Sequence, residues 1–75
     1  MTHENYKLIR NAMNDCYNVF YAKWAQKSLN EPLSDKDWIT IVSETKIIVK
    51  RYENTICASL AMKLLLELIE LLERR

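Results

Sequence analysis

Apolar residues recur at steps of three and four along most of this chain, which is the spacing of one face of an α-helix. Between residues 3 and 28 they form a stripe about 120° wide on a helical wheel: Tyr6, Ile9, Met13, Cys16, Tyr17, Phe20 and Trp24. Thr2 can cap the start, and the segment SLNEP ends the stripe, because the residue before a proline is pushed out of the helical region. The pattern predicts a first helix over residues 3–28.

The clearest helix start is the segment PLSDKDW. Ser34 is a natural N-cap, acidic residues follow where the helix dipole favours negative charge, and Leu33 can pack on Trp38. These features predict a second helix over residues 35–52. Its expected inner face consists of Trp38, Ile41, Val42, Thr45, Ile48, Val49 and Tyr52.

A leucine-rich helix is predicted over residues 56–73, with Asn54 or Thr55 as its cap. Its apolar residues cover an arc of about 200°, and two neighbouring helices would cover most of that arc. We therefore expect this helix at the centre of the fold. Three helices with short connections predict an all-α protein, a single domain over residues 1–75 arranged as an up-down-up three-helix bundle.

Composition excludes several classes of functional site. The chain has 75 residues and no glycine, and phosphate-cradling loops, dinucleotide turns and nucleophile elbows depend on glycine. The only histidine is His3, and Cys16 and Cys57 lack CxxC spacing, so we expect no metal and no cofactor. Both cysteines are expected to be buried, reduced thiols. We predict that the protein is not an enzyme.

Charge and hydropathy indicate a protein that acts away from membranes. Eleven basic and ten acidic residues give a net charge of +1, so no strong field attracts anionic partners. Lys63, Glu67 and Glu70 interrupt the leucine-rich run before the ~20 apolar residues that a membrane span needs. The polar N-terminal segment MTHENYKLIRNAMND has no apolar core of a signal peptide, so we expect a cytoplasmic protein.

Some apolar residues fall outside the predicted inner faces. A weaker seam on the first helix contains Leu8, Ala12, Val19 and Ala22. Several exposed apolar residues in one small domain are typical of a contact surface. A symmetric homodimer is the simplest closed association, and another protein is the alternative partner. The predicted interaction residues are Leu8, Val19, Tyr21, Ile39, Ile47 and Leu66.

Nucleic-acid binding is an alternative function. Basic residues on the outer side of the second helix could contact phosphates: Lys36, Lys46, Lys50 and Arg51. Asp35 and Glu44 dilute this patch, and the third helix lacks the basic surface of a recognition helix. No small-molecule ligand is implied.

The segment LSDKDWITIVSETKIIVKRYENT, followed by a leucine-rich helix ending ELLERR, resembles small helical proteins encoded in prophages and other mobile elements of Gram-positive bacteria. In those proteins a capped helix beginning D-W-x-x-I/V and ending K-x-Y precedes a leucine-rich C-terminal helix. The resemblance covers residues 33–75. It implies a protein-interaction role, such as that of a phage-encoded modulator that binds a host protein.

Overall fold

The computed structural model describes residues 1–74, and those residues form helices and short connections without a strand. The helical elements are α1 (His3–Met13), the π-helical segment η1 (Asn14–Tyr21), α2 (Ala22–Asn30), α3 (Asp35–Tyr52) and α4 (Ala58–Arg74). Because α1, η1 and α2 follow one another without a break, we call them together the long helix. The all-α prediction is confirmed, while Arg75 lies outside the described residues.

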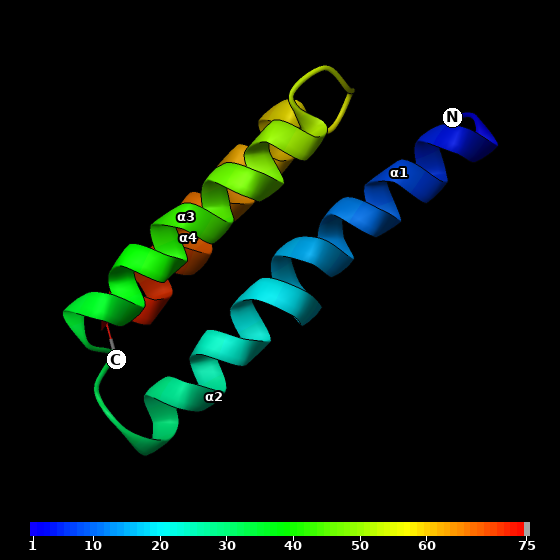
Figure 1. Ribbon diagram of the computed structural model, residues 1–75. Helices are drawn as coiled ribbons and strands as arrows, with labels where there is room; N and C mark the ends of the chain where they lie inside the picture. Colours follow the sequence, from blue (N-terminus) through cyan, green and yellow to red (C-terminus); the bar gives the residue numbers. More distant parts are fainter. Residues whose placement is uncertain (75) are drawn as a thin grey trace.

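The three helical rods lie side by side along a molecule that measures 42 × 18 × 16 Å. Figure 1 shows α3 running back along η1 and α2 after the turn that follows the long helix, and α4 returning behind α3 in that view. The first part of the long helix, α1, extends past the end of α3, and of its residues only Ala12 is buried. Thus α1 is the least covered part of the fold.

The helix ends follow local rules that the sequence had indicated. The Asn5 N–H donates to the Thr2 hydroxyl at 3.0 Å and caps α1. Glu31, which precedes Pro32, is extended with φ −154° and ψ 153°, and it ends the long helix two residues later than predicted. The predicted bounds of α3 are confirmed, with Ser34 as its N-cap.

The third helix starts at Ala58 rather than at residue 56 and continues to Arg74. Thr55 occupies the turn before it, where its hydroxyl donates to the Tyr52 carbonyl at 2.7 Å and accepts from the Cys57 N–H at 3.1 Å. These two hydrogen bonds hold the turn and delay the first helical residue.

The buried row of the long helix differs from the predicted stripe. Its members are each four residues apart: Ala12, Cys16, Phe20, Trp24 and Ser28. In a pure α-helix, with 3.6 residues per turn, such a row drifts by about 40° at each step. A π-helix bonds residue i to i+5 and turns less per residue, so η1 offsets the drift and keeps the row facing the core.

This row corrects the sequence analysis in two ways. Tyr6, Met13 and Tyr17 were expected inside but are exposed, whereas Ala12 was expected on the weaker outer seam but is buried. The prediction was wrong at Ala12, Met13 and Tyr17 because it assumed a turn of 100° per residue across η1. Tyr6 is exposed because it lies in α1, which extends past the end of α3.

The second and third rods bury narrower stripes than expected. In α3 the buried residues are Ile41, Ile48 and Tyr52, and Val42 is exposed. In α4 the buried residues are Ala61, Leu65, Leu68 and Leu72. The neighbouring helices cover most of the leucine-rich arc, since Leu64 and Ile69 also pack against the core, but Leu60, Met62 and Leu71 remain exposed, as does Leu66 beside the arc.

Candidate protein-interaction surface

Acid–base contacts join the long helix to α3 at three levels. The N···O distances are 2.8 Å for Arg51–Asp15, 2.6 Å for Lys23–Glu44 and 2.7 Å for Lys27–Asp37. We call this row of contacts the polar seam. Since each contact needs both partners at the same level, the polar seam fixes how far the long helix is shifted along α3.

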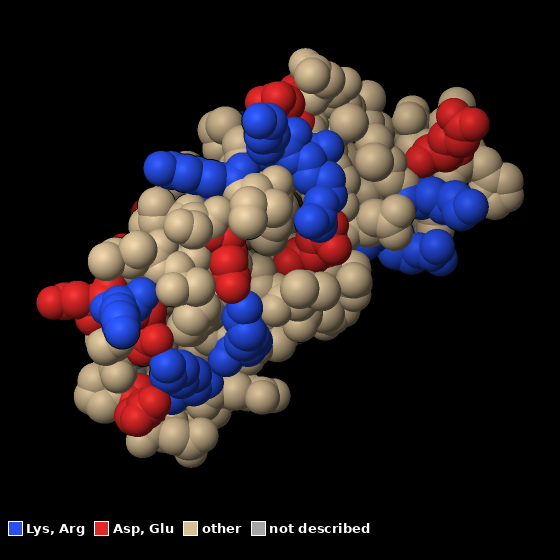
Figure 2. Space-filling view, in the orientation of Figure 1, with Lys and Arg blue, Asp and Glu red and all other residues tan. Residues whose placement is uncertain are grey.

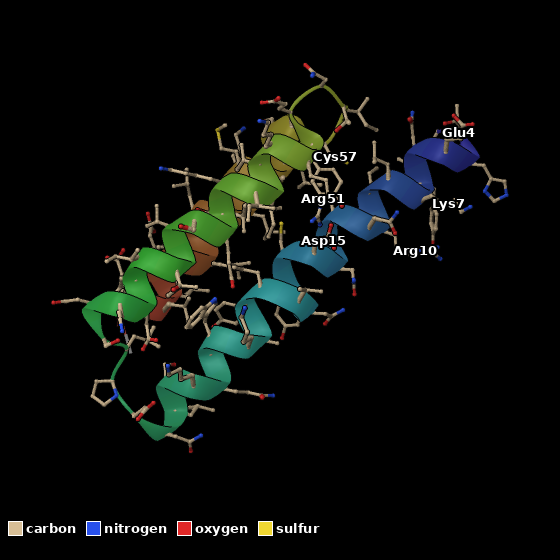
Figure 3. All side chains as sticks on the ribbon, viewed as in Figure 1. Glu4, Lys7, Arg10, Asp15, Arg51 and Cys57 are labelled. Carbon is tan, nitrogen blue, oxygen red and sulfur yellow. The ribbon has the colours of Figure 1, made fainter. Side chains whose placement is uncertain are left out.

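At one end of the polar seam, Asp15 serves two donors. It accepts from the Arg51 guanidinium and from the Tyr52 hydroxyl, the latter at 2.5 Å, and Figure 3 shows Asp15 and Arg51 pointing toward each other. Burial, together with the nearby Asp15 carboxylate, raises the pKa of the Tyr52 phenol to about 12. The hydrogen bond to Asp15 raises the pKa of Arg51. Asp15 therefore anchors a buried phenol as well as a surface cation.

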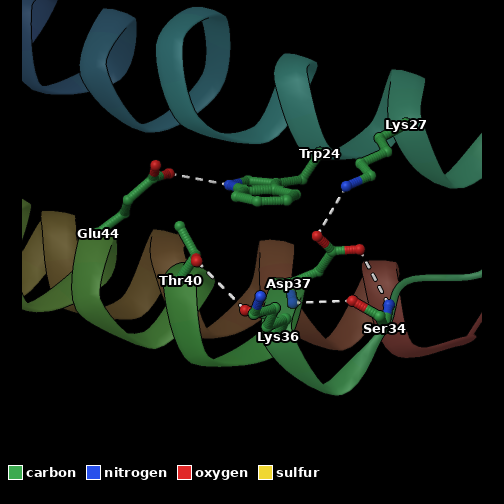
Figure 4. A network of polar contacts seen from close by, with 7 residues as sticks. All are labelled: Trp24, Lys27, Ser34, Lys36, Asp37, Thr40 and Glu44. Atoms are coloured by element: carbon green, nitrogen blue, oxygen red, sulfur yellow. Dashed lines mark hydrogen bonds and ion pairs between the residues drawn. The ribbon is translucent and has the colours of Figure 1, made fainter.

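Further along the polar seam, Glu44 bridges a lysine and a tryptophan. One carboxylate oxygen accepts from Lys23, and the other accepts from the Trp24 indole N–H at 2.9 Å. The ammonium groups of Lys23 and Lys27 lie 5.0 and 5.8 Å from the Trp24 ring centroid, within cation–π distance. Figure 4 shows the indole between Glu44 and Lys27. The polar seam thus covers the edge of the buried row.

The last contact of the polar seam is built into the start of α3. Asp37 accepts from Lys27 and from the Ser34 backbone N–H at 2.9 Å, while the Asp37 N–H donates to the Ser34 hydroxyl at 3.1 Å (Figure 4). The hydrogen bond from Lys27, followed by that from Ser34, lowers the pKa of Asp37, and the same contact raises the pKa of Lys27. The helix cap and the interhelical contact therefore share one carboxylate.

A hollow of about 160 Å³ lies between the first two contacts of the polar seam, and we call it the seam groove. Its lining consists of Asp15, Val19, Phe20, Lys23, Glu44, Ile47, Ile48 and Arg51. Val19 and Ile47 are 57% and 58% exposed, whereas Phe20 beneath them is buried. Along both helices an apolar residue stands between an acid and a base. The seam groove is well below the ~300 Å³ of typical small-molecule sites, so it suits inserted side chains.

Four of the six predicted interaction residues are exposed. Val19 and Ile47 meet in the seam groove, and Ile39 and Leu66 lie elsewhere on the surface. Leu8 and Tyr21 are instead half-buried against the core, so the expectation that the bundle leaves them uncovered is wrong.

The displacement of Tyr21 follows from the altered turn of the long helix in η1. Tyr21 stacks on Tyr17 with ring centroids 5.7 Å apart, and Tyr17 is the exposed member of the pair. The sequence pattern had predicted the opposite, with Tyr17 buried and Tyr21 exposed. An α-helical wheel cannot predict correctly which residues of η1 are buried, because each residue there turns by less than 100°.

A second apolar area lies on the side of α3 that faces away from the polar seam. On α3, Ile39 and Val42 are exposed beside half-buried Trp38. On α4, Leu71 lines a hollow with α2 residues, so Met62 and Leu66 lie on the opposite flank, toward α3. We call the exposed residues Ile39, Val42, Met62 and Leu66 the α3–α4 face. Val42 and Met62 were missed because their positions had been assigned to buried arcs.

The predicted nucleic-acid residues do not form one free patch. Lys36, Lys46 and Lys50 are exposed on α3, but Arg51 is paired with Asp15 and lines the seam groove. Figure 2 shows basic and acidic side chains interspersed over this side of the molecule.

Within residues 1–74, no cluster of three or more His, Cys, Asp or Glu side chains could hold a metal ion. Cys16 and Cys57 are both buried and unbridged. Burial raises the pKa of the Cys16 thiol to about 11, which disfavours the reactive thiolate. No helix in the described part of the chain is long and apolar enough to cross a membrane.

Comparison with protein-family models, curated proteins and solved structures finds no match to this chain.

Proposed function

We propose that this protein is a small, non-enzymatic protein-interaction domain, an up-down-up three-helix bundle that associates as a homodimer. One observation carries the proposal. Among the described residues, fourteen large hydrophobic residues are exposed, against twelve hydrophobic residues in the buried core. Scattered apolar residues are normal on a surface, but so many in one small domain, the residues of the α3–α4 face among them, indicate a contact surface.

The small size of the molecule also supports association with a partner. A chain of this length buries only roughly 60% of its unfolded surface, so a partner adds to a small core. Within the proposal, the resemblance to small prophage proteins extends the role to a modulator that binds a host protein, with the same apolar surface as its means of contact.

The test is the mass of the protein in solution. Sedimentation equilibrium and light scattering, from low micromolar to millimolar protein, should show twice the mass of the chain at the upper end of the range. A strict monomer throughout would contradict the proposal.

Nucleic-acid binding is the second candidate, and the exposed lysines Lys36, Lys46 and Lys50 are the observation that favours it. A salt-sensitive gel shift of duplex DNA by low-micromolar protein would support it. The variant Lys46→Glu/Lys50→Glu should then abolish the shift. Binding that persists in this variant would exclude the predicted patch.

A further inference from the structure

We infer that the seam groove is a self-complementary docking site for a second copy of this chain, laid antiparallel across the first. This inference rests on the proposed function and names the surface and the partner. It begins from the order of residues along the two helices. The long helix presents Asp15, Val19 and Lys23, and α3 presents Arg51, Ile47 and Glu44 at the same three levels.

The four charges alternate in sign around the two apolar residues. An acid faces a base across the groove at each end, and an acid and a base also follow each other along each helix. The bases protrude, since the side chains of Lys23 and Arg51 are 52% and 53% exposed, while those of Glu44 and Asp15 are 28% and 20% exposed. The protruding cations can therefore reach carboxylates on a facing surface.

A two-fold axis that runs across the groove brings opposite charges together. It places Lys23 of each copy over Asp15 of the other, and Arg51 of each copy over Glu44 of the other. Val19 then meets Val19, and Ile47 meets Ile47, at the centre. Such an interface is isologous, because the same patch serves both subunits, and complementary charges at its edges fix its alignment.

The long helix favours this antiparallel arrangement over one with the axis along the groove. Sixteen helical residues precede Val19 and eleven follow it, and the excess is the poorly covered α1. In an antiparallel pair, α2 of one copy lies beside much of α1 of the other. An axis along the groove would leave both α1 segments projecting at the same end.

The area of the molecule allows such an interface. A stable interface takes ~800 Å² from each partner. One long side, 42 by 18 Å, has roughly that footprint, so the pair must use most of the side that contains the seam groove. The α3–α4 face is more apolar, yet nothing in its charges specifies a partner.

The first experiment separates the two surfaces. Ile47→Glu places a charge at the centre of the proposed interface and should raise the dimer Kd at least about tenfold. The matched variant Leu66→Glu, at a residue equally exposed on the α3–α4 face, should change the Kd by less than about twofold. Circular dichroism and urea unfolding of the diluted monomers check that both variants fold.

The second experiment tests the charge pattern. Lys23→Glu/Glu44→Lys keeps an ion pair within the chain but sets like charges against each other across the antiparallel interface. It should raise the Kd at least about tenfold. Adding Asp15→Arg/Arg51→Asp inverts all four charges, restores the alternation and should recover dimerisation. Rescue of this kind is not expected from a merely structural role.

The outcomes distinguish the inference from the proposed function. If Leu66→Glu disrupts the dimer and Ile47→Glu does not, the seam groove is not the dimer interface, but the proposed function stands. A dimer unaffected by the exchange of Lys23 and Glu44 would overturn the antiparallel arrangement. A wild-type protein that stays monomeric at all concentrations would overturn both.

Discussion

The two flanks of α3 are held in different ways. Toward the long helix, three acid–base contacts and the hydrogen bonds of Trp24 and Tyr52 form the polar seam. Toward α4, within residues 1–74, no side-chain hydrogen bond or ion pair joins the helices, and the contact consists of apolar packing such as that of Ile41 and Leu65. Directional contacts specify register, whereas apolar burial supplies stabilisation without a preferred orientation.

The two flanks of α3 also differ in the apolar surface that they leave exposed. Where the polar seam runs, charged side chains occupy the edges and only Val19 and Ile47 stay open between them. On the α3–α4 face, the hollow beside Ile39 and Val42 is lined by one charged residue, Lys46, so acids and bases do not alternate there as they do in the seam groove. The first surface carries a pattern that a partner must match, and the second does not.

The largest expected effect comes from the apolar flank. Leu65→Ala removes a buried side chain of α4 and leaves a cavity, so it should lower the free energy of unfolding by about 2–5 kcal/mol. Leu66→Ala, one residue away and 59% exposed, should change it by less than ~0.5 kcal/mol in the monomer. Urea unfolding measures both. If Leu65→Ala and Leu66→Ala lower the free energy of unfolding by similar amounts, α4 does not bury Leu65 and expose Leu66 as described.

At the polar seam, the expected effect depends on which partner is removed. Asp15→Ala leaves the buried Tyr52 hydroxyl without its acceptor and should cost about 1–3 kcal/mol. Arg51→Ala removes a half-exposed cation and should cost less than ~1 kcal/mol. Urea unfolding at neutral pH compares them. If Arg51→Ala costs as much as Asp15→Ala, the phenol is not the group that Asp15 stabilises.

The pKa of Tyr52 predicts a loss of stability in alkali. The folded chain holds this pKa at about 12, above the ordinary value of 10.0. The stabilisation is therefore complete below pH 10 and is lost as the pH rises through 12. The loss at pH 11 is about 1 kcal/mol. Thermal unfolding at pH 9 and pH 11 measures it. Tyr52→Phe should flatten this dependence, and an unchanged slope would contradict the assignment.

Local residues allowed the helix ends to be predicted, because caps act over three or four positions. Ser34 was sufficient to place the start of α3, and Pro32 placed the end of the long helix to within two residues. The π-helical segment could not be predicted, since a row spaced by four also fits an α-helix over two turns. The meeting of Val19 with Ile47 depends on contacts between residues far apart in sequence, such as Asp15 and Arg51.

A signal for the seam groove was nevertheless present in the sequence. Asp15, Val19 and Lys23 follow one another at steps of four, and Glu44, Ile47 and Arg51 follow at steps of three and four. Each series places an apolar residue between opposite charges, in antiparallel order. The two series are complementary in charge and order, which is the pattern of two helices that pair in antiparallel orientation.

The smallest expected effect tests whether the polar seam gives register rather than stability. Lys23→Ala removes a half-exposed ammonium group, while Glu44 keeps its hydrogen bond from Trp24, so the loss should be below about 1 kcal/mol. Because the lost contact is an exposed ion pair, the difference from wild type should shrink further in molar salt, where the Debye length is about 3 Å. Urea unfolding at low and high salt measures both values. A loss as large as that of Leu65→Ala, or one that does not change with salt, would mean that the polar seam stabilises the fold as strongly as the apolar flank does. The contrast between the two sides of α3 would then disappear.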